Sequence, residues 1–292
     1  MTNPQSSNFQ REASPFVYAF FMSLVAATAS AALKYIGADV SVEFITFWQF
    51  SVCLVIAIIV IHQKKLSVND LAAIEKSDRY ILFIRGLSGW CGFYTFYLAI
   101  SKIPLVDATL LRHSSPLFVP IISLLWFGVK TPWLTVSFIG FGFVGVYVTL
   151  QPETNGFNFY HLVGLCSAMF LAISMVSTNY LKKYDSAIVL FYYFLISFLG
   201  MLPLGIIHWQ SVTWFQAGLM LYIGLSIYIA MYCYNKAFTL SSASLVSPMT
   251  YLSIVHAGLL GWLIWGHMPT LLSMVGMAIV VACGLVTTLM RR

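Results

Sequence analysis

Charged residues are scarce in this 292-residue chain. Asp, Glu, Lys and Arg make up only 8% of it and hydrophobic residues 60%, whereas a soluble domain usually carries about 25% charged residues. A globule of this size cannot cover its surface with so few charges, but helices that face lipid need none. The composition therefore excludes a water-soluble fold and predicts an all-α integral membrane protein whose partner is the lipid bilayer.

The sequence also lacks the motifs of several enzyme and pump classes. It contains no G-x-x-x-x-G-K-[ST] loop for ATP and no H-E-x-x-H zinc motif. The five cysteines are odd in number and show no C-x-x-C spacing, so they predict neither a disulfide framework nor a zinc site. The stretch Gly140–Gly145 spells G-x-G-x-x-G, but it lies inside an apolar run, and its glycines are interpreted as helix-packing residues. We predict no cofactor, no resident metal and no enzymatic activity.

Ten apolar segments, each long enough to cross a bilayer, fill the chain. In chain order they cover residues 15–36, 44–61, 80–100, 106–128, 133–150, 160–181, 186–207, 215–235, 243–265 and 269–290. Ala27-Thr28-Ala29 imitates a signal-peptide cleavage site, but the apolar run continues to Ile36, and we interpret the first segment as a span. The connections between the segments are too short for a soluble domain.

The basic residues predict the orientation of these spans. With the N-terminus in the cytoplasm, only Lys34 and Lys102 fall outside, Arg112 lies within a span, and all other Lys and Arg, including Arg85, lie inside. Lys and Arg are dispersed in ones and twos, which indicates topology signals and no nucleic-acid partner. We therefore predict an inner-membrane protein with both termini in the cytoplasm.

The two halves of the chain align without large gaps. The matched segments are Phe47-Trp48-Gln49-Phe50 with Phe191-Tyr192-Tyr193-Phe194, Gly86-Leu87-Ser88 with Gly224-Leu225-Ser226, Tyr94 with Tyr232, Ala99 with Ala237, and Gly128 with Gly266. Because five spans are repeated and five is odd, the second copy enters the membrane in the opposite direction. The predicted organisation is a cytoplasmic tail (1–14), a first five-helix repeat (15–150), an external linker (151–159) and a second, inverted five-helix repeat (160–292).

Three runs in the first half resemble a known family. They are Ile84-Arg85-Gly86-Leu87, the stretch from Leu98 to Thr109 that contains Lys102-Ile103-Pro104-Leu105, and Ser115-Pro116-Leu117-Phe118. The chain resembles the EamA-type members of the drug/metabolite transporter superfamily over nearly its whole length. The resemblance implies a ten-helix secondary transporter for small metabolites, with a central cavity lined by the spans at 80–100, 106–128, 215–235 and 243–265. The chain departs from the family pattern at Gly128-Val129 and Gly266-His267, where Gly-Glu is frequent, and at Gln49, where many members have Arg.

Aromatic residues form the first candidate substrate site. Trp90, Tyr94 and Tyr97 follow i, i+4, i+7 spacing and share one helical face. The repeat-equivalent residues are Tyr228, Tyr232 and Asn235. Two such faces near a pseudo-twofold axis would stack on a flat or partly apolar solute. The alternative is an interfacial aromatic belt or plain packing, which we disfavour because Trp90 and Tyr94 lie in the middle of their span.

A basic pair inside the fourth predicted span forms the second candidate site. Arg112 and His113 lie within an apolar segment, where a basic residue costs about 2.5 to 3.5 kcal/mol on insertion scales. Pro116 and Pro120 follow them and predict a kink, as Pro248 does in the ninth span. The repeat partners are Thr250 and Tyr251, which supply hydroxyls without charge. The alternative is that Arg112 extends to the outer interface, towards Asp107.

Two further observations bear on the mechanism. His256 lies in the middle of the ninth span, where a lone histidine is usually a hydrogen-bonded packing residue. No Asp or Glu lies near the middle of any predicted span, so the usual carboxylate proton relay is missing.

Together these features predict a secondary transporter that moves a small metabolite by alternating access. The expected substrates are an amino acid, a nucleoside-bearing metabolite such as S-adenosylmethionine, or a similar zwitterion or anion. The predicted binding residues are Trp90, Tyr94, Tyr97, Arg112, His113, Tyr228, Tyr232, Asn235 and Tyr251. The alternatives are an integral membrane enzyme, which would need paired carboxylates or a metal cluster, and a channel, which would need re-entrant loops.

Overall fold

The computed structural model describes residues 15–67, 70, 74–128, 132–150, 158–240 and 251–289, and within these ranges the chain is helical and contains no strand. The helices are α1 (Pro15–Ile36), α2 (Val42–Gln63), α4 (Lys76–Lys102), α5 (Leu105–His113), α6 (Ser115–Phe127), α7 (Trp133–Leu150), α8 (Phe159–Tyr180), the short 3₁₀ helix η1 (Leu181–Lys183), α9 (Ser186–Ile207), α10 (Trp214–Leu240), α12 (Leu252–Trp265) and α13 (Leu271–Leu289).

Several of these helices are long and apolar enough to cross a membrane. Among the described residues six spans meet that requirement, and α7, α12 and α13 contain shorter apolar helices. The chain is therefore a multi-pass membrane protein. Only the second part of the predicted span at 243–265 is described, as α12, and Pro248 and Thr250 lie outside the described residues.

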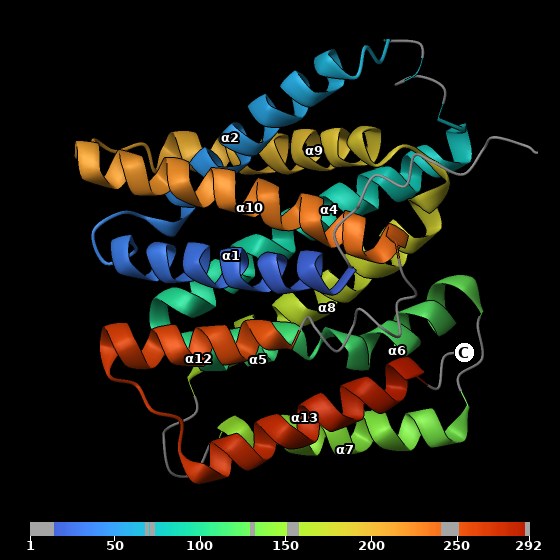
Figure 1. Cartoon of the computed structure of the whole chain (residues 1–292), viewed down its shortest axis with the longest axis vertical. Coiled ribbons are helices and arrows are strands. Elements are labelled where there is room, and N and C mark those ends of the chain that lie inside the picture. The colour runs from blue at the N-terminus through green and yellow to red at the C-terminus, as the bar shows by residue number, and fades with distance from the viewer. Residues whose placement is uncertain are drawn as a thin grey trace, which may run out of the picture.

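The helices pack in pairs that join the first half of the chain to the second (Figure 1). Helix α4 packs along α8, and α1 packs along α10. At one edge of the bundle α2 lies against α9, and at the opposite edge α7 lies against α13. Between these edges, α5 packs on α12. Most of the large helix contacts are thus made between the two halves rather than within one of them.

Local sequence signals explain where several helices begin and end. The Ser41 hydroxyl accepts a hydrogen bond from the Phe44 N–H at 3.3 Å and caps α2, and Asp185 caps α9 in the same way. Gly128 and Gly266 end α6 and α12 with φ values of +65° and +69°, a conformation that a side chain would disfavour. These glycines are the pair that the internal alignment matches.

The span predicted at 106–128 is interrupted. Helix α5 ends at His113 and α6 begins at Ser115, with the Ser114 N–H bonded to the Leu111 carbonyl at 3.2 Å. Pro116 explains the interruption, because proline has no N–H and its ring clashes with the carbonyl four residues earlier, that of Arg112. The kink expected from the proline lies immediately after the basic pair.

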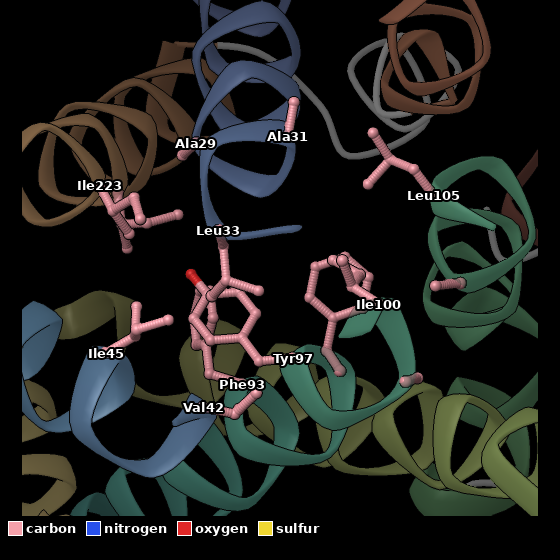
Figure 2. Packing of buried hydrophobic residues seen from close by; sticks show 14 of the residues in the cluster. Ala29, Ala31, Leu33, Val42, Ile45, Phe93, Tyr97, Ile100, Leu105 and Ile223 are labelled. Atoms are coloured by element: carbon pink, nitrogen blue, oxygen red, sulfur yellow. The ribbon is translucent and has the colours of Figure 1, made fainter. Parts of the chain in front are cut away.

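Buried apolar residues pack together at the end of the bundle where α1 and α4 finish. Leu33 and Ile100 are fully buried, and Leu105 at the start of α5 packs with them. Figure 2 shows side chains from α1, α2, α4, α5 and α10 converging in this cluster, with Tyr97 among them. A cavity lies on the N-terminal side of this cluster, earlier on α1 and α4.

Candidate substrate-binding cavity

A cavity of about 120 Å³ lies between the helices, next to the buried cluster. Helices α1, α4, α5, α6, α8, α10 and α12 contribute to its wall. Most of the wall is apolar and includes the flexible side chains of Met22, Met175 and Met231, which adapt to irregular ligand shapes. Small hydroxyl groups are interspersed, as in many small-molecule sites. The polar hydroxyl residues are Ser30, Thr109, Ser115, Ser174, Thr178 and Ser253.

Arg112 lines this cavity from the end of α5 and is only 8% exposed. Its Nη1 donates a hydrogen bond of 2.8 Å to the Gly92 carbonyl oxygen. The guanidinium carbon lies 4.6 Å from the ring centroids of both Phe93 and Phe96, so the cation is held by two aromatic faces. No acidic residue faces it among the described residues. The side chain therefore points into the bundle and not towards Asp107.

Arg85 is a second buried cation on the same wall, although the count of basic residues assigned it to the cytoplasmic side. Counted among the cytoplasmic basic residues, it is instead 2% exposed and lines the cavity from within α4. Its Nη1 donates a hydrogen bond to Ser174 Oγ, and its guanidinium carbon lies 4.3 Å from the Tyr193 ring centroid. Its Nε has no hydrogen-bond partner within the described residues. The signal for this site was in the sequence, because Arg85 falls inside the predicted span 80–100.

The acidic residues that the structure describes lie away from this cavity, and none of them lines it. The described ion pairs join Lys64 to Asp185 at 2.9 Å, and Lys183 to Asp78 at 2.7 Å and to Glu75 at 3.6 Å. These pairs belong to the end of the bundle where α4 and α9 begin. Because a buried cation without a counter-ion is destabilising by several kcal/mol, the cavity favours a ligand with negative charge.

His113 and the helix break complete the polar side of the cavity. His113 lines the wall directly after Arg112, and Ser115 and Pro116 line it at the beginning of α6. The Ser115 hydroxyl lies 3.7 Å from Met175 Sδ on α8. The interrupted span thus brings the basic pair and the first turn of α6 to one place.

The aromatic face that the sequence predicts on α4 points away from the cavity. Trp90, Tyr94 and Tyr97 are absent from the cavity wall, and each donates a hydrogen bond away from it. The acceptors are Met201 Sδ at 3.2 Å, Glu43 Oε1 at 2.9 Å and Gln49 Oε1, respectively. Neighbouring residues on a helix point about 100° apart, so the side of α4 that carries Phe93 and Phe96 faces the cavity instead.

The matching residues of the second half are also absent from the cavity wall. Tyr228 is 9% exposed and stacks on Phe194, whereas Tyr232 is 46% exposed. Asn235 is half-buried, and Tyr251 is buried with no hydrogen-bond partner for its hydroxyl in the described part of the chain. Among the predicted residues, the structure therefore brings only Arg112 and His113 to the cavity. Helix α10 contributes Ile227, Ala230, Met231 and Tyr234.

His256 also lies away from this wall. Its Nδ1 is 3.2 Å from Ser23 Oγ, and its ring lies 5.4 Å from that of Phe20, so it joins α12 to α1. This is the environment expected of a packing histidine.

Apolar membrane-spanning helices around a cavity are typical of membrane transporters. A model of the EamA-like transporter family matches residues 13–151 and 158–289. The chain belongs to this family, and it is a transporter and not an enzyme.

Three curated relatives are named as transporters of organic metabolites. The pseudopaline exporter CntI of Pseudomonas aeruginosa is 31% identical over 222 residues, which cover 72% of this chain and 76% of the relative. An S-adenosylmethionine uptake transporter of Rickettsia bellii is 24% identical over 266 residues, 90% of this chain and 89% of the relative. A riboflavin transporter of Vibrio cholerae is 27% identical over 206 residues, 70% and 67% of the two chains.

The fold is also found in a solved structure. A crystal structure with 18% sequence identity superposes with a TM-score of 0.66 and covers 94% of this chain and 96% of its own. The likeness extends over both halves of the bundle.

Proposed function

We propose that this protein is a secondary transporter that carries a small organic metabolite with an anionic group across the inner membrane by alternating access. The observation that carries the proposal is Arg112, a buried guanidinium that lines the cavity without an acidic partner among the described residues. Arg is suited to this task, because its planar fork binds a carboxylate through two parallel hydrogen bonds.

The proposed architecture is ten spans in two inverted repeats of five. The reciprocal packing of the helices supports it. Helix α4 packs on α8 as α10 packs on α1, and α4 packs on α9 as α10 packs on α2. The pairs α2–α9, α5–α12 and α7–α13 each join equivalent elements of the two repeats. A pseudo-twofold axis in the membrane plane would produce this pattern, and it would pass near the cavity.

We propose that the buried cluster around Leu33, Ile100 and Leu105 is the closed external gate. With both termini in the cytoplasm, α1 and α4 run outwards and finish at this cluster. The cavity residues on the same helices, Met22 to Ser30 and Arg85 to Phe96, precede it in the chain. The described conformation would then be the inward-facing one, and transport would require these apolar contacts to separate.

The positive charge of the cavity favours some of the metabolites named for the relatives over others. Two guanidiniums and no acidic side chain among the described lining residues disfavour a substrate with net positive charge. S-Adenosylmethionine carries a cationic sulfonium, so we propose that this chain prefers a substrate with carboxylate or comparable anionic groups. Phe93, Phe96 and the three methionines would contact its apolar body.

A ligand screen on the purified protein tests the function. Thermal unfolding is measured against a metabolite library sorted by charge, because a ligand of the folded state raises the apparent stability. We expect anions and zwitterions to raise the melting temperature of the wild-type chain and cations to leave it unchanged. Arg112→Gln should lose the response, whereas Tyr232→Ala, a change outside the cavity wall, should retain it. Stabilisation by cations alone would contradict the proposal.

A further inference from the structure

Arg85 and Arg112 approach one small pocket from different helices. The pocket has a volume of about 10 Å³, and Arg112 lines it together with Ser174 and Tyr193. The Arg85 guanidinium contacts both of these neighbours. Its Nη1 donates a hydrogen bond to Ser174 Oγ, and its carbon lies 4.3 Å from the Tyr193 ring centroid. Two residues of the pocket wall thus connect one cation to the other.

The small pocket adjoins the main cavity on the side of the two arginines. Both spaces are lined by Phe93, Arg112, Leu171, Ser174 and Met231. Arg85 itself lines the main cavity. A volume of about 10 Å³ is close to the space that one water molecule needs. The pocket can therefore receive one oxygen atom of a ligand whose other atoms lie in the main cavity.

The positive charge at this place is not balanced by the part of the protein that the structure describes. Both guanidiniums are buried, and no acidic residue among the described ones lines either space. The Nε of Arg85 has no hydrogen-bond partner within the described residues. A buried charge without a counter-ion is destabilising, so two such charges at one place favour a ligand that brings two negative charges to that place.

A phosphate monoester carries two negative charges on a single head group. At about pH 7 its charge is about −1.5 to −2, and it has three strong acceptor oxygens, whereas a carboxylate has one charge and two oxygens. Each guanidinium presents a planar fork of N–H donors that fits two oxygens. A carboxylate would leave one of the two cations uncompensated, but a phosphate would match both the charge and the donors.

We propose that the substrate is an organic phosphate monoester whose head group is bound by Arg85 and Arg112 together, at the junction of the small pocket and the main cavity. This inference rests on the proposed transport of an anionic metabolite and names the chemical class of its acidic group. It assigns a substrate-binding role to Arg85. The organic part of the ligand would lie against Phe93, Met175 and the other apolar residues of the main cavity.

A matched pair of esters tests the charge of the head group, with the full-length protein in nanodiscs of zwitterionic lipid. Phenyl phosphate and phenyl sulfate have similar shapes, but only the phosphate gains a second negative charge, with a pKa of about 6. We expect phenyl phosphate to bind about tenfold or more tightly than phenyl sulfate at about pH 7.5 in calorimetry. The preference should disappear at about pH 5, where each ester carries one charge. His113 also lines the cavity, but its protonation affects both esters alike.

Two variants of Arg85 test its contact with the head group. Arg85→Gln should weaken the binding of both esters and remove most of the preference for the phosphate. Arg85→Lys should retain the preference at lower affinity, since an ammonium keeps the charge but not the planar fork. Arg79→Gln is the matched control, because Arg79 lies on α4 outside the cavity wall, where its Nε donates to the Ile74 carbonyl. This control should bind both esters as the wild-type protein does.

The possible failures of the two proposals are distinguishable. Equal affinities for the two esters at both pH values would overturn the phosphate head group and leave anion transport standing, and failure of every anion to bind, benzoate included, would overturn both. Inorganic phosphate should bind more weakly than phenyl phosphate, because it lacks the apolar body, and tighter binding would assign the site to the free ion. If Arg85→Gln does not fold, the wild-type pH series decides the charge of the head group, and full wild-type affinity in Arg85→Lys would refute the contact.

Discussion

Replacing Arg112 by Gln separates a role in substrate binding from a role in stability. In the free protein the guanidinium gains about 1.5 to 3 kcal/mol from its hydrogen bond to the Gly92 carbonyl. It gains up to about 2 kcal/mol from each of the contacts with Phe93 and Phe96. Burial of the charge opposes these gains by several kcal/mol. Because these contributions nearly offset one another, we expect Arg112→Gln to change the stability of the free protein little.

The affinity for an anionic substrate should respond strongly to the same change. Removing one partner of a buried, charged contact costs about 2 to 5 kcal/mol, which corresponds to a loss of about 30-fold to about 5,000-fold in affinity. Arg112→Lys should be intermediate, since an ammonium restores the charge but not the bidentate geometry.

The assay combines calorimetric affinities with thermal unfolding of the three free proteins. An interfacial anchor would behave differently, because Lys would replace Arg without loss and Gln would lower stability more than affinity. Full affinity in a well-folded Arg112→Gln protein would refute the binding role.

Three further predictions concern other parts of the structure. A Cβ at Gly89 would overlap the Tyr193 ring, so Gly89→Ala should lower stability by about 1 to 3 kcal/mol in denaturation experiments and displace the ring that supports the second arginine; unchanged unfolding would argue against this packing. In a variant without native cysteines, a cysteine at Ser211 should react with an impermeant thiol reagent from outside the cell and one at Asp185 should not, and the reverse pattern would invert the proposed topology. Hydrogen bonds from Lys183 and Tyr184 hold the pKa of Asp78 below its usual 3.8. Asp78→Asn should therefore lower the free energy of unfolding near neutral pH, and the difference from wild type should shrink as the pH falls below 3.8. A difference in unfolding free energy that stays constant with pH would exclude this ion pair as the cause.

Much of the helical architecture could be predicted from the sequence. The span predicted at 186–207 coincides with α9, because apolar runs between polar breaks are a direct consequence of the bilayer thickness. Gly128 and Gly266 were matched as repeat partners, and both end helices in the left-handed conformation that favours glycine. Such requirements act locally and are therefore visible in the sequence.

The cavity itself was harder to predict. An aromatic triplet on α4 indicated a face, but a helix that is apolar on every side gives no sign of which face meets the cavity, and Phe93 and Phe96 line it instead of Tyr94. Arg85 was counted as a topology signal because charge counting depends on the position of a residue along the chain and not on the direction of its side chain. Arg112 was recognised because the cost of burying a cation is a property of the residue and its span.

A counterflow measurement in proteoliposomes tests the central claim most directly. Vesicles that contain the purified protein are loaded with the unlabelled anion that binds most tightly, and uptake of the labelled anion is followed for wild type and Arg112→Gln. We expect the internal anion to accelerate uptake by the wild-type protein, with saturation, because a carrier returns loaded to the opposite side. Uptake by Arg112→Gln at equal protein content should fall to the level of empty vesicles. Uptake that is linear in concentration, insensitive to the internal anion and unchanged in Arg112→Gln would contradict both alternating access and the arginine site.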